Sequence, residues 1–148
     1  MIAIRVGDRF DKSVVIDAAS IRAFATLAGD FNPLHHDAVA AARGPYGVLI
    51  ASGPQLVSLM LGVDATHFSA AGVAVGLGFD FKFVKGVPAG TELVLAWTVT
   101  RCDYKPSLRG WIVAVEGTAC DAAGTLYVSA RGSNLVRERV DEARQAAS

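Results

Sequence analysis

The sequence is poor in charged residues and has no excess of either sign. Only 19% of the 148 residues are charged, with fourteen basic against fourteen acidic side chains, whereas 52% are hydrophobic. Binding to nucleic acid or to an anionic membrane surface calls for a basic excess, so neither partner is expected. Disordered chains are polar and strongly charged, so this composition indicates a single folded domain with a sizeable core.

Cysteine is also scarce, and no segment has the character of a signal peptide or a membrane span. Cys102 and Cys120 lie in separate predicted strands, which favours reduced, buried thiols in a cytoplasmic protein. The N-terminus reaches charges at Arg5 and Asp8 before any apolar core could form. The uncharged stretch 44–63 is interrupted by glycine, proline and polar residues, so it indicates a loop followed by a buried helix.

The sequence has no internal repeats or low-complexity linkers, so the fold is inferred from the order of the predicted helices and strands. The apolar spacing predicts a strand at 12–17, an amphipathic helix at 17–29 and a second short helix at 33–44 with Asn32 as its cap. A helix at 52–63 is apolar on nearly every face, which is typical of a helix wrapped by other structure.

Alternating patterns then predict four strands, at 74–84, 92–102, 110–120 and 125–136. In the first of them, one face carries Leu77, Phe79, Phe81 and Phe83. Short connections favour antiparallel pairing between consecutive strands. The expected fold class is therefore α+β, with an antiparallel sheet of about five strands wrapped around a central apolar helix, which is the hotdog arrangement. Residues 1–136 form this single domain, and the charged tail 137–148 is expected to be a frayed helix or disordered.

The stretch AGDFNPLHHD, residues 28–37, concentrates polar chemistry in an apolar chain. Pro33 forces a bend after Asn32, so Asp30 and His35 can converge on one point. A helix start near His35 favours a neutral imidazole and an ionised Asp30, and the two together can hold a single water for general acid–base catalysis. The structural alternative is that D-x-N-P simply caps a helix. No metal is expected, because adjacent histidines on a helix point about 100° apart. His36, Asp37 and His67 are interpreted as surface or loop residues.

The second motif is SGP, residues 52–54, at the start of the wrapped helix. Free amides at a helix N-terminus can stabilise an oxyanion, and since Pro54 has no N–H, Gly53 is the expected donor. A plain helix start with glycine at the cap remains the alternative.

Together, FATLAGDFNPLHHD and GVLIASGPQLVS resemble the MaoC-like (R)-specific enoyl-CoA hydratases, over roughly residues 6–136. The resemblance implies that Asp30 and His35 hold the water that adds to a trans-2-enoyl thioester. It also implies that Asn32 and Ser58 support the site and that the Gly53 amide binds the thioester oxygen. The acyl chain would lie beside the wrapped helix, against Leu56, Met60, Phe79 and Phe81, although plain core packing explains each of these side chains as well.

One departure from the family bears on the substrate. Ser52-Gly53-Pro54 stands where many hydratases have His-Gly-Met. The acyl chain length and the choice between coenzyme A and acyl carrier protein as thioester carrier therefore stay open. Two other functions are considered: a non-catalytic thioester-binding subunit of a heteromeric dehydratase, and a hotdog acyl-CoA thioesterase. No cofactor is expected. A homodimer or a higher homo-oligomer is expected, because a lone hotdog sheet leaves edge strands and one flat face exposed.

Overall fold

The structure is a computed structural model, and it describes residues 3–139. Its strands are β1 (Arg9–Ile16), β2 (Val73–Phe83), β3 (Thr91–Lys105), β4 (Gly110–Cys120) and β5 (Leu126–Arg137). Its helices are α1 (Ala18–Ala28), α2 (Ala38–Arg43) and α3 (Gly53–Ala71), with short 3₁₀ turns at Pro33–His35 and Pro106–Leu108. None of the helices formed within this range is long and apolar enough to cross a membrane.

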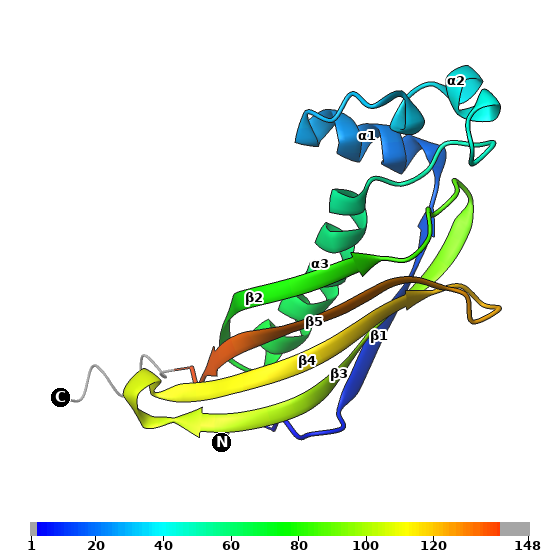
Figure 1. Cartoon of the computed structure of the whole chain (residues 1–148). Helices are drawn as coiled ribbons and strands as arrows, with labels where there is room; N and C mark the ends of the chain where they lie inside the picture. Colours follow the sequence, from blue (N-terminus) through cyan, green and yellow to red (C-terminus); the bar gives the residue numbers. More distant parts are fainter. Residues whose placement is uncertain (1–2, 140–148) are drawn as a thin grey trace.

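The five strands form one antiparallel sheet in the order β1-β3-β4-β5-β2 (Figure 1). The expected pairing of consecutive strands holds for β3, β4 and β5 but is wrong for β2, which lies at the far edge beside β5. The segment 84–90 makes this possible, because it does not form a hairpin turn. Val84 N–H donates to Tyr127 O in β5, and Gly90 N–H donates to the O of Ile16, the last residue of β1. The chain thus crosses from the edge strand β2 past β5 and β4 to β3, which lies next to the opposite edge strand β1.

Helix α3 packs on the inner face of the sheet and is two turns longer than expected. It buries one stripe rather than its whole circumference: Leu56, Met60, Asp64 and Phe68 recur every four residues. The indole N–H of the fully buried Trp97 donates to Met60 O at 2.9 Å, which fastens the helix to β3. The hotdog fold class expected from the sequence is confirmed.

Glycines on β4 and β5 make room for the large aromatic rings of this inner face. A Cβ atom at Gly117 would lie 2.5 Å from the Trp97 ring, and one at Gly132 would lie 2.1 Å from Phe79. On β2 the register shifts between Gly76 and Gly78, and Leu77, which lies at this irregularity, is 53% exposed.

The segment before α3 corrects two other sequence predictions. Helix α1 has the expected ends, with Asp17 as N-cap and Gly29 in the left-handed conformation at φ 72°, although its Leu27 is 86% exposed. The single helix expected at 33–44 is wrong, because it is divided into the 3₁₀ turn and α2. The division arises because Asp37 caps a new helix, its carboxylate accepting from the N–H groups of Val39 and Ala40.

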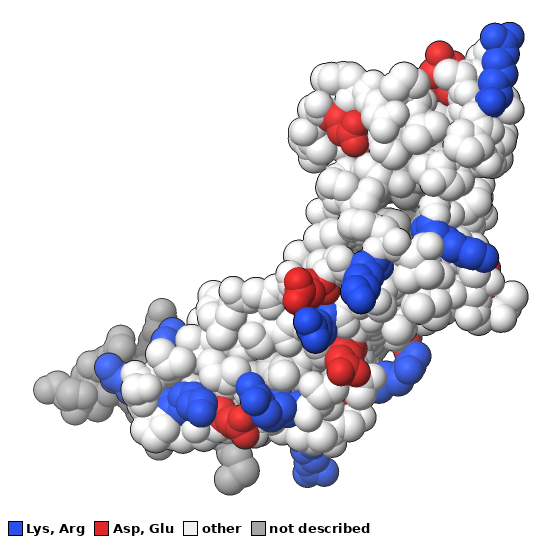
Figure 2. Space-filling view, viewed as in Figure 1, with Lys and Arg blue, Asp and Glu red and all other residues white. Residues whose placement is uncertain are grey.

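The outer surface mixes charges of both signs. Figure 2 shows acidic and basic side chains interspersed on the face in view, without a large patch of one sign. Cys102 and Cys120 are free, half-buried thiols on β3 and β4. Strand β5 includes Arg137, the first residue of the tail predicted from the sequence. Residues 140–148 of that tail lie outside the described part of the chain.

Candidate active site

Asp30 is held in place by the end of α1. Because Gly29 turns the chain, Asp30 N–H donates back to Ala25 O at 2.8 Å. The Asp30 carboxylate then accepts from Asn32 N–H at 3.0 Å through Oδ1. This leaves Oδ2 free to face other groups, and about a third of the side chain is exposed to solvent.

His35 faces Asp30 from the 3₁₀ turn. Its ring is almost fully buried, and Nδ1 lies 2.8 Å from Ile50 O. A carbonyl oxygen only accepts hydrogen bonds, so Nδ1 carries the hydrogen. In the neutral ring Nε2 is therefore an acceptor, and it lies 3.5 Å from Asp30 Oδ2. The hydrogen bond to Ile50 O thus defines the tautomer of the neutral ring. The helix start expected near His35 is a 3₁₀ turn, and α2 begins only at Ala38.

Two acceptors cannot hydrogen-bond to each other, but at 3.5 Å apart they can share a water molecule that donates to both. Such a water would donate one hydrogen to Asp30 Oδ2 and the other to His35 Nε2. A carboxylate placed in this way can remove a proton while the imidazole orients the oxygen. The structure therefore brings Asp30 and His35 together in an arrangement suited to activating water.

Asn32 supports this arrangement through the backbone. Its side-chain Oδ1 accepts from Leu34 N–H at 3.1 Å, which caps the 3₁₀ turn that carries His35. The capping interpretation and the catalytic interpretation of the D-x-N-P motif are therefore compatible. Asn32 shapes the turn, while the Asp30 carboxylate and the His35 imidazole face each other.

Gly53 is the first residue of α3, as expected. Ser52 Oγ accepts from Gln55 N–H at 3.3 Å, Ser52 O accepts from Leu56 N–H, and Pro54 has no N–H. Within residues 3–139, the amide of Gly53 is thus the first-turn donor left without a partner. The ring of Phe83 lies against Gly53, since an added Cβ atom would be 2.9 Å from Phe83 Cζ.

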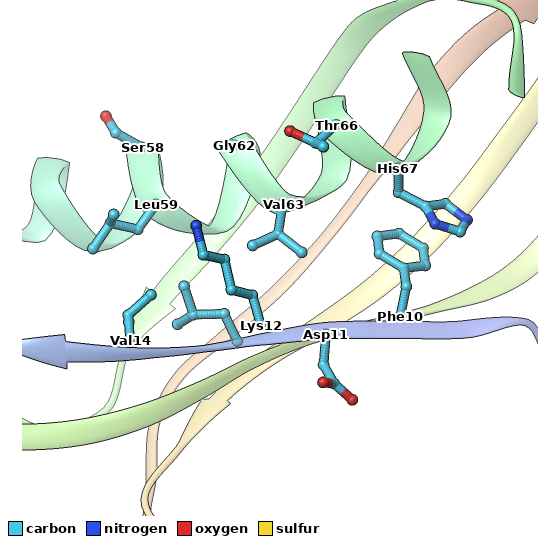
Figure 3. A pocket seen from close by; sticks show the side chains of 11 residues that line it. Phe10, Asp11, Lys12, Val14, Ser58, Leu59, Gly62, Val63, Thr66 and His67 are labelled. Carbon is cyan, nitrogen blue, oxygen red and sulfur yellow. The ribbon is translucent and has the colours of Figure 1, made fainter. Parts of the chain in front are cut away.

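Ser58 lies further along α3 than Gly53. It borders a cavity of about 500 Å³ between α3 and β1, together with Phe10, Lys12 and Val63 (Figure 3). The structure shows no contact of Ser58 with Asp30 or His35 among the described residues. His67, expected on the surface, lines the same cavity and stacks on Phe10 with ring centroids 3.7 Å apart. Burial lowers the pKa of His67 from its usual value.

The four side chains expected around the acyl chain occupy the core. Leu56 and Met60 are almost fully buried, and the rings of Phe79 and Phe81 meet Trp97 edge to face at centroid distances of 5.8 and 6.3 Å. They do not surround one open cavity. Phe79 alone borders a cavity between α3 and β2, and Phe81 borders a different hollow that lies over the sheet.

Three polar residues make buried or partly buried hydrogen bonds that the sequence did not predict. His36 is half-buried, and its Nε2 donates to Asp30 O at 2.6 Å while its ring stacks on Phe31. Asp64 and Asn134 are buried and joined by a 3.0 Å hydrogen bond. An acidic residue four positions after Met60, on the buried stripe, is the sequence signal that could have identified Asp64. Within residues 3–139, no group of three potential ligands could hold a metal ion.

Comparison with known proteins gives a consistent result. The sequence profile described as "MaoC like domain" matches residues 4–116. The (R)-specific enoyl-CoA hydratase of Aeromonas caviae is 34% identical over 98 residues, which are 66% of this chain and 72% of the relative. The 3-hydroxyacyl-thioester dehydratase Z of Mycobacterium tuberculosis is 27% identical over 141 residues, 92% of each chain.

The fold agrees as well. The solved structure of the (R)-hydratase from A. caviae involved in PHA biosynthesis superposes with a TM-score of 0.81 at 26% identity, covering 93% of this chain and 98% of that one. Since the profile spans most of the chain and the hydratase matches above 30% identity, the chain belongs to the MaoC-like domain family and is an enzyme of the hydratase and dehydratase class.

Proposed function

We propose that this protein adds water to trans-2-enoyl-CoA thioesters to give (R)-3-hydroxyacyl-CoA, or catalyses the reverse dehydration. The observation that carries the proposal is the approach of His35 Nε2 to Asp30 Oδ2 at 3.5 Å, with the tautomer of His35 defined by Ile50 O. The relatives named as an (R)-specific enoyl-CoA hydratase and a 3-hydroxyacyl-thioester dehydratase support the substrate class.

In this mechanism a water molecule lies between Asp30 Oδ2 and His35 Nε2. Asp30 takes one proton as the water oxygen forms a bond to C3, and the electron pair of the C2–C3 double bond moves into the thioester as an enolate. Gly53 N–H, at the positive end of α3, stabilises the enolate oxygen. Protonation at C2 completes the addition, with the proton returned from the Asp30–His35 pair. The reverse sequence removes water.

Crotonyl-CoA provides the direct assay. Loss of enoyl absorbance without release of free thiol indicates hydration, whereas thiol release indicates a thioesterase. If neither signal changes for any chain length tested, a non-catalytic thioester-binding subunit is the better description. Product formed by the wild-type protein should be the (R) enantiomer on chiral analysis, and the same acyl group on acyl carrier protein tests the carrier.

We also propose that the protein forms a homodimer through β2. This strand is an edge of the sheet, and its Val73, Val75 and Leu77 are each about half exposed. An exposed apolar edge strand favours pairing with another chain, and a symmetric pair would extend the sheet across two copies.

A further inference from the structure

The first turn of α3 contains a buried polar side chain that the proposed reaction does not use. Gln55 is only 2% exposed, and its Nε2 donates to Ser20 Oγ of α1 at 3.3 Å. Ser20 Oγ already donates its single hydrogen to Asp17 O, so it can only accept from Gln55, which defines the orientation of the amide. Gln55 Oε1 is then the buried side-chain atom left without a hydrogen-bond partner among residues 3–139.

The side chain of Gln55 does not serve the local role that its position predicts. Ser52-Gly53-Pro54-Gln55 has the S-x-x-Q pattern of a capping box, in which the serine and the glutamine exchange two hydrogen bonds. One of them forms, because Ser52 Oγ accepts from Gln55 N–H at 3.3 Å. The other does not, because Oε1 accepts from no group and Nε2 reaches Ser20 instead. The amide therefore links two helices and does not complete the cap of α3.

This link joins the two elements that carry the proposed reacting groups. Asp30 follows the end of α1, to which its N–H is tied by the hydrogen bond to Ala25 O. Gly53 begins α3, two residues before Gln55. Helix α1 lies across this end of α3, and the two helices make few contacts with each other (Figure 1). The hydrogen bond from Gln55 to Ser20 is thus a side-chain contact that relates the Gly53 amide to the Asp30 carboxylate.

We propose that Gln55 is a positioning residue for the reaction, which through Ser20 holds Gly53 N–H in register with the Asp30 carboxylate. This inference rests on the proposed function, because it takes Gly53 as the donor to the enolate oxygen. Such a donor acts mainly on the transition state, and a small displacement of it lowers the rate of the chemical step. Loss of the contact should therefore lower kcat and leave KM nearly unchanged.

A purely stabilising role for Gln55 predicts a different result. A buried acceptor without a donor costs folding free energy, so an apolar side chain of similar length should pack between α1 and α3 at least as well. In Gln55→Met, a positioning role predicts a lower kcat with an unchanged or higher urea midpoint. A stabilising role predicts that the urea midpoint falls and that the folded protein keeps its kcat.

The test measures steady-state hydration of crotonyl-CoA and urea unfolding on the same preparations. Gln55→Met and Ser20→Ala remove the contact from its two sides, and their double variant completes a cycle. Ser20→Ala decides the question if Gln55→Met does not fold, and Ser20→Thr restores the hydroxyl group. Ser69→Ala is the matched control, because Ser69 Oγ also donates to a backbone oxygen three residues earlier but has no glutamine partner.

Gln55→Met and Ser20→Ala should each lower kcat by about tenfold to a hundredfold, the cost of a misplaced reacting group, with KM within about threefold of wild type. The double variant should lose no more than the more impaired single variant, because both changes remove one contact. Ser20→Thr and Ser69→Ala should keep the wild-type kcat.

The inference is overturned if Gln55→Met folds and keeps kcat within about twofold of wild type, or if its kcat falls only together with the urea midpoint. In the case of an unfolded Gln55→Met, an unchanged kcat in Ser20→Ala overturns it. Either result, with normal turnover by the wild-type protein, leaves the proposed function intact. A folded wild-type protein that hydrates no enoyl-CoA overturns both.

Discussion

Replacing Asp30 by asparagine tests the site with the least disturbance to its shape. The retained Oδ1 still accepts from Asn32 N–H at 3.0 Å, so the turn into the 3₁₀ helix is preserved. The new Nδ2 occupies the position of Oδ2, 3.5 Å from His35 Nε2. The acceptor that receives the proton of water is thereby replaced by a donor, and this donor competes for the lone pair of His35.

The expected loss follows from the role of the carboxylate. General base catalysis contributes about 10² to 10⁴ in rate, so Asp30→Asn should lower kcat/KM for crotonyl-CoA by that factor. This corresponds to about 3 to 5 kcal/mol of activation free energy at 1.36 kcal/mol per tenfold change. Stability should change by less than about 1 kcal/mol, because the Asp30 side chain is 34% exposed and asparagine keeps the hydrogen bond from Asn32 N–H.

The assay is steady-state loss of enoyl absorbance, combined with urea unfolding of the same preparations. Asp37→Asn is the matched control: it makes the same chemical change seven residues away, where asparagine can still cap α2 by accepting from Val39 and Ala40 N–H. The control should retain wild-type activity. An Asp30→Asn protein with more than about a tenth of wild-type kcat/KM would refute Asp30 as the base.

The remaining predictions concern stability and assembly. Burial raises the pKa of Asp64 to about 6, so the folded protein loses this proton only at higher pH than the unfolded chain does. In urea titrations, the free energy of unfolding of the wild-type protein should therefore fall by about 1 to 3 kcal/mol relative to that of Asp64→Asn as the pH rises from 4 to 7. A difference in unfolding free energy between the two proteins that does not depend on pH contradicts this. Gly117→Ala should cost about 1 to 3 kcal/mol, because its Cβ atom would lie 2.5 Å from the buried Trp97 ring, whereas Gly62→Ala, with nothing within 4 Å, should be stabilising in the same denaturation experiment. Val75→Lys on the β2 edge should shift the molecular mass in light scattering from dimer towards monomer, and an unchanged mass argues against the proposed interface.

Local signals in the sequence predicted local structure well. Strand β4 has the expected bounds, because glycine and cysteine positions flank an uninterrupted alternating pattern between two turns. Helix α1 begins and ends at its expected caps, since Asp17 accepts from Ser20 N–H and Gly29 adopts the left-handed conformation. In both elements, the interactions that set the ends involve residues close together in the sequence, so the spacing of residue types predicts them.

Features that depend on distant contacts could not be predicted in this way. The place of β2 at the far edge follows from hydrogen bonds of Val84 to Tyr127 and of Gly90 to Ile16, which no local pattern reveals. Leu27 fits the apolar spacing of α1 but lies outside its contact with the core. The bulge near Leu77 shifts the register of one strand against its neighbour, which alternation alone does not show.

The same distinction between local and distant contacts applies to the functional residues. Asp30 and His35 are five residues apart around a proline bend, so their approach could be expected from the sequence. His36 was misread because its partner is a backbone carbonyl, that of Asp30, and a carbonyl leaves no signature in the sequence. Asp64 and Asn134 are seventy positions apart, so their pairing needed the folded structure.

A short backbone segment, from Ile50 to Gly53, connects the water site with the proposed oxyanion donor. Ile50 accepts from His35 Nδ1 through its carbonyl and donates its N–H to Leu34 O at 3.1 Å. Three residues later the chain enters α3 at Gly53. The imidazole that orients water and the amide that stabilises the enolate are thus attached to opposite ends of a four-residue segment. A shift of that segment alters both at once, so effects of changes at the water site and at the amide should not be additive.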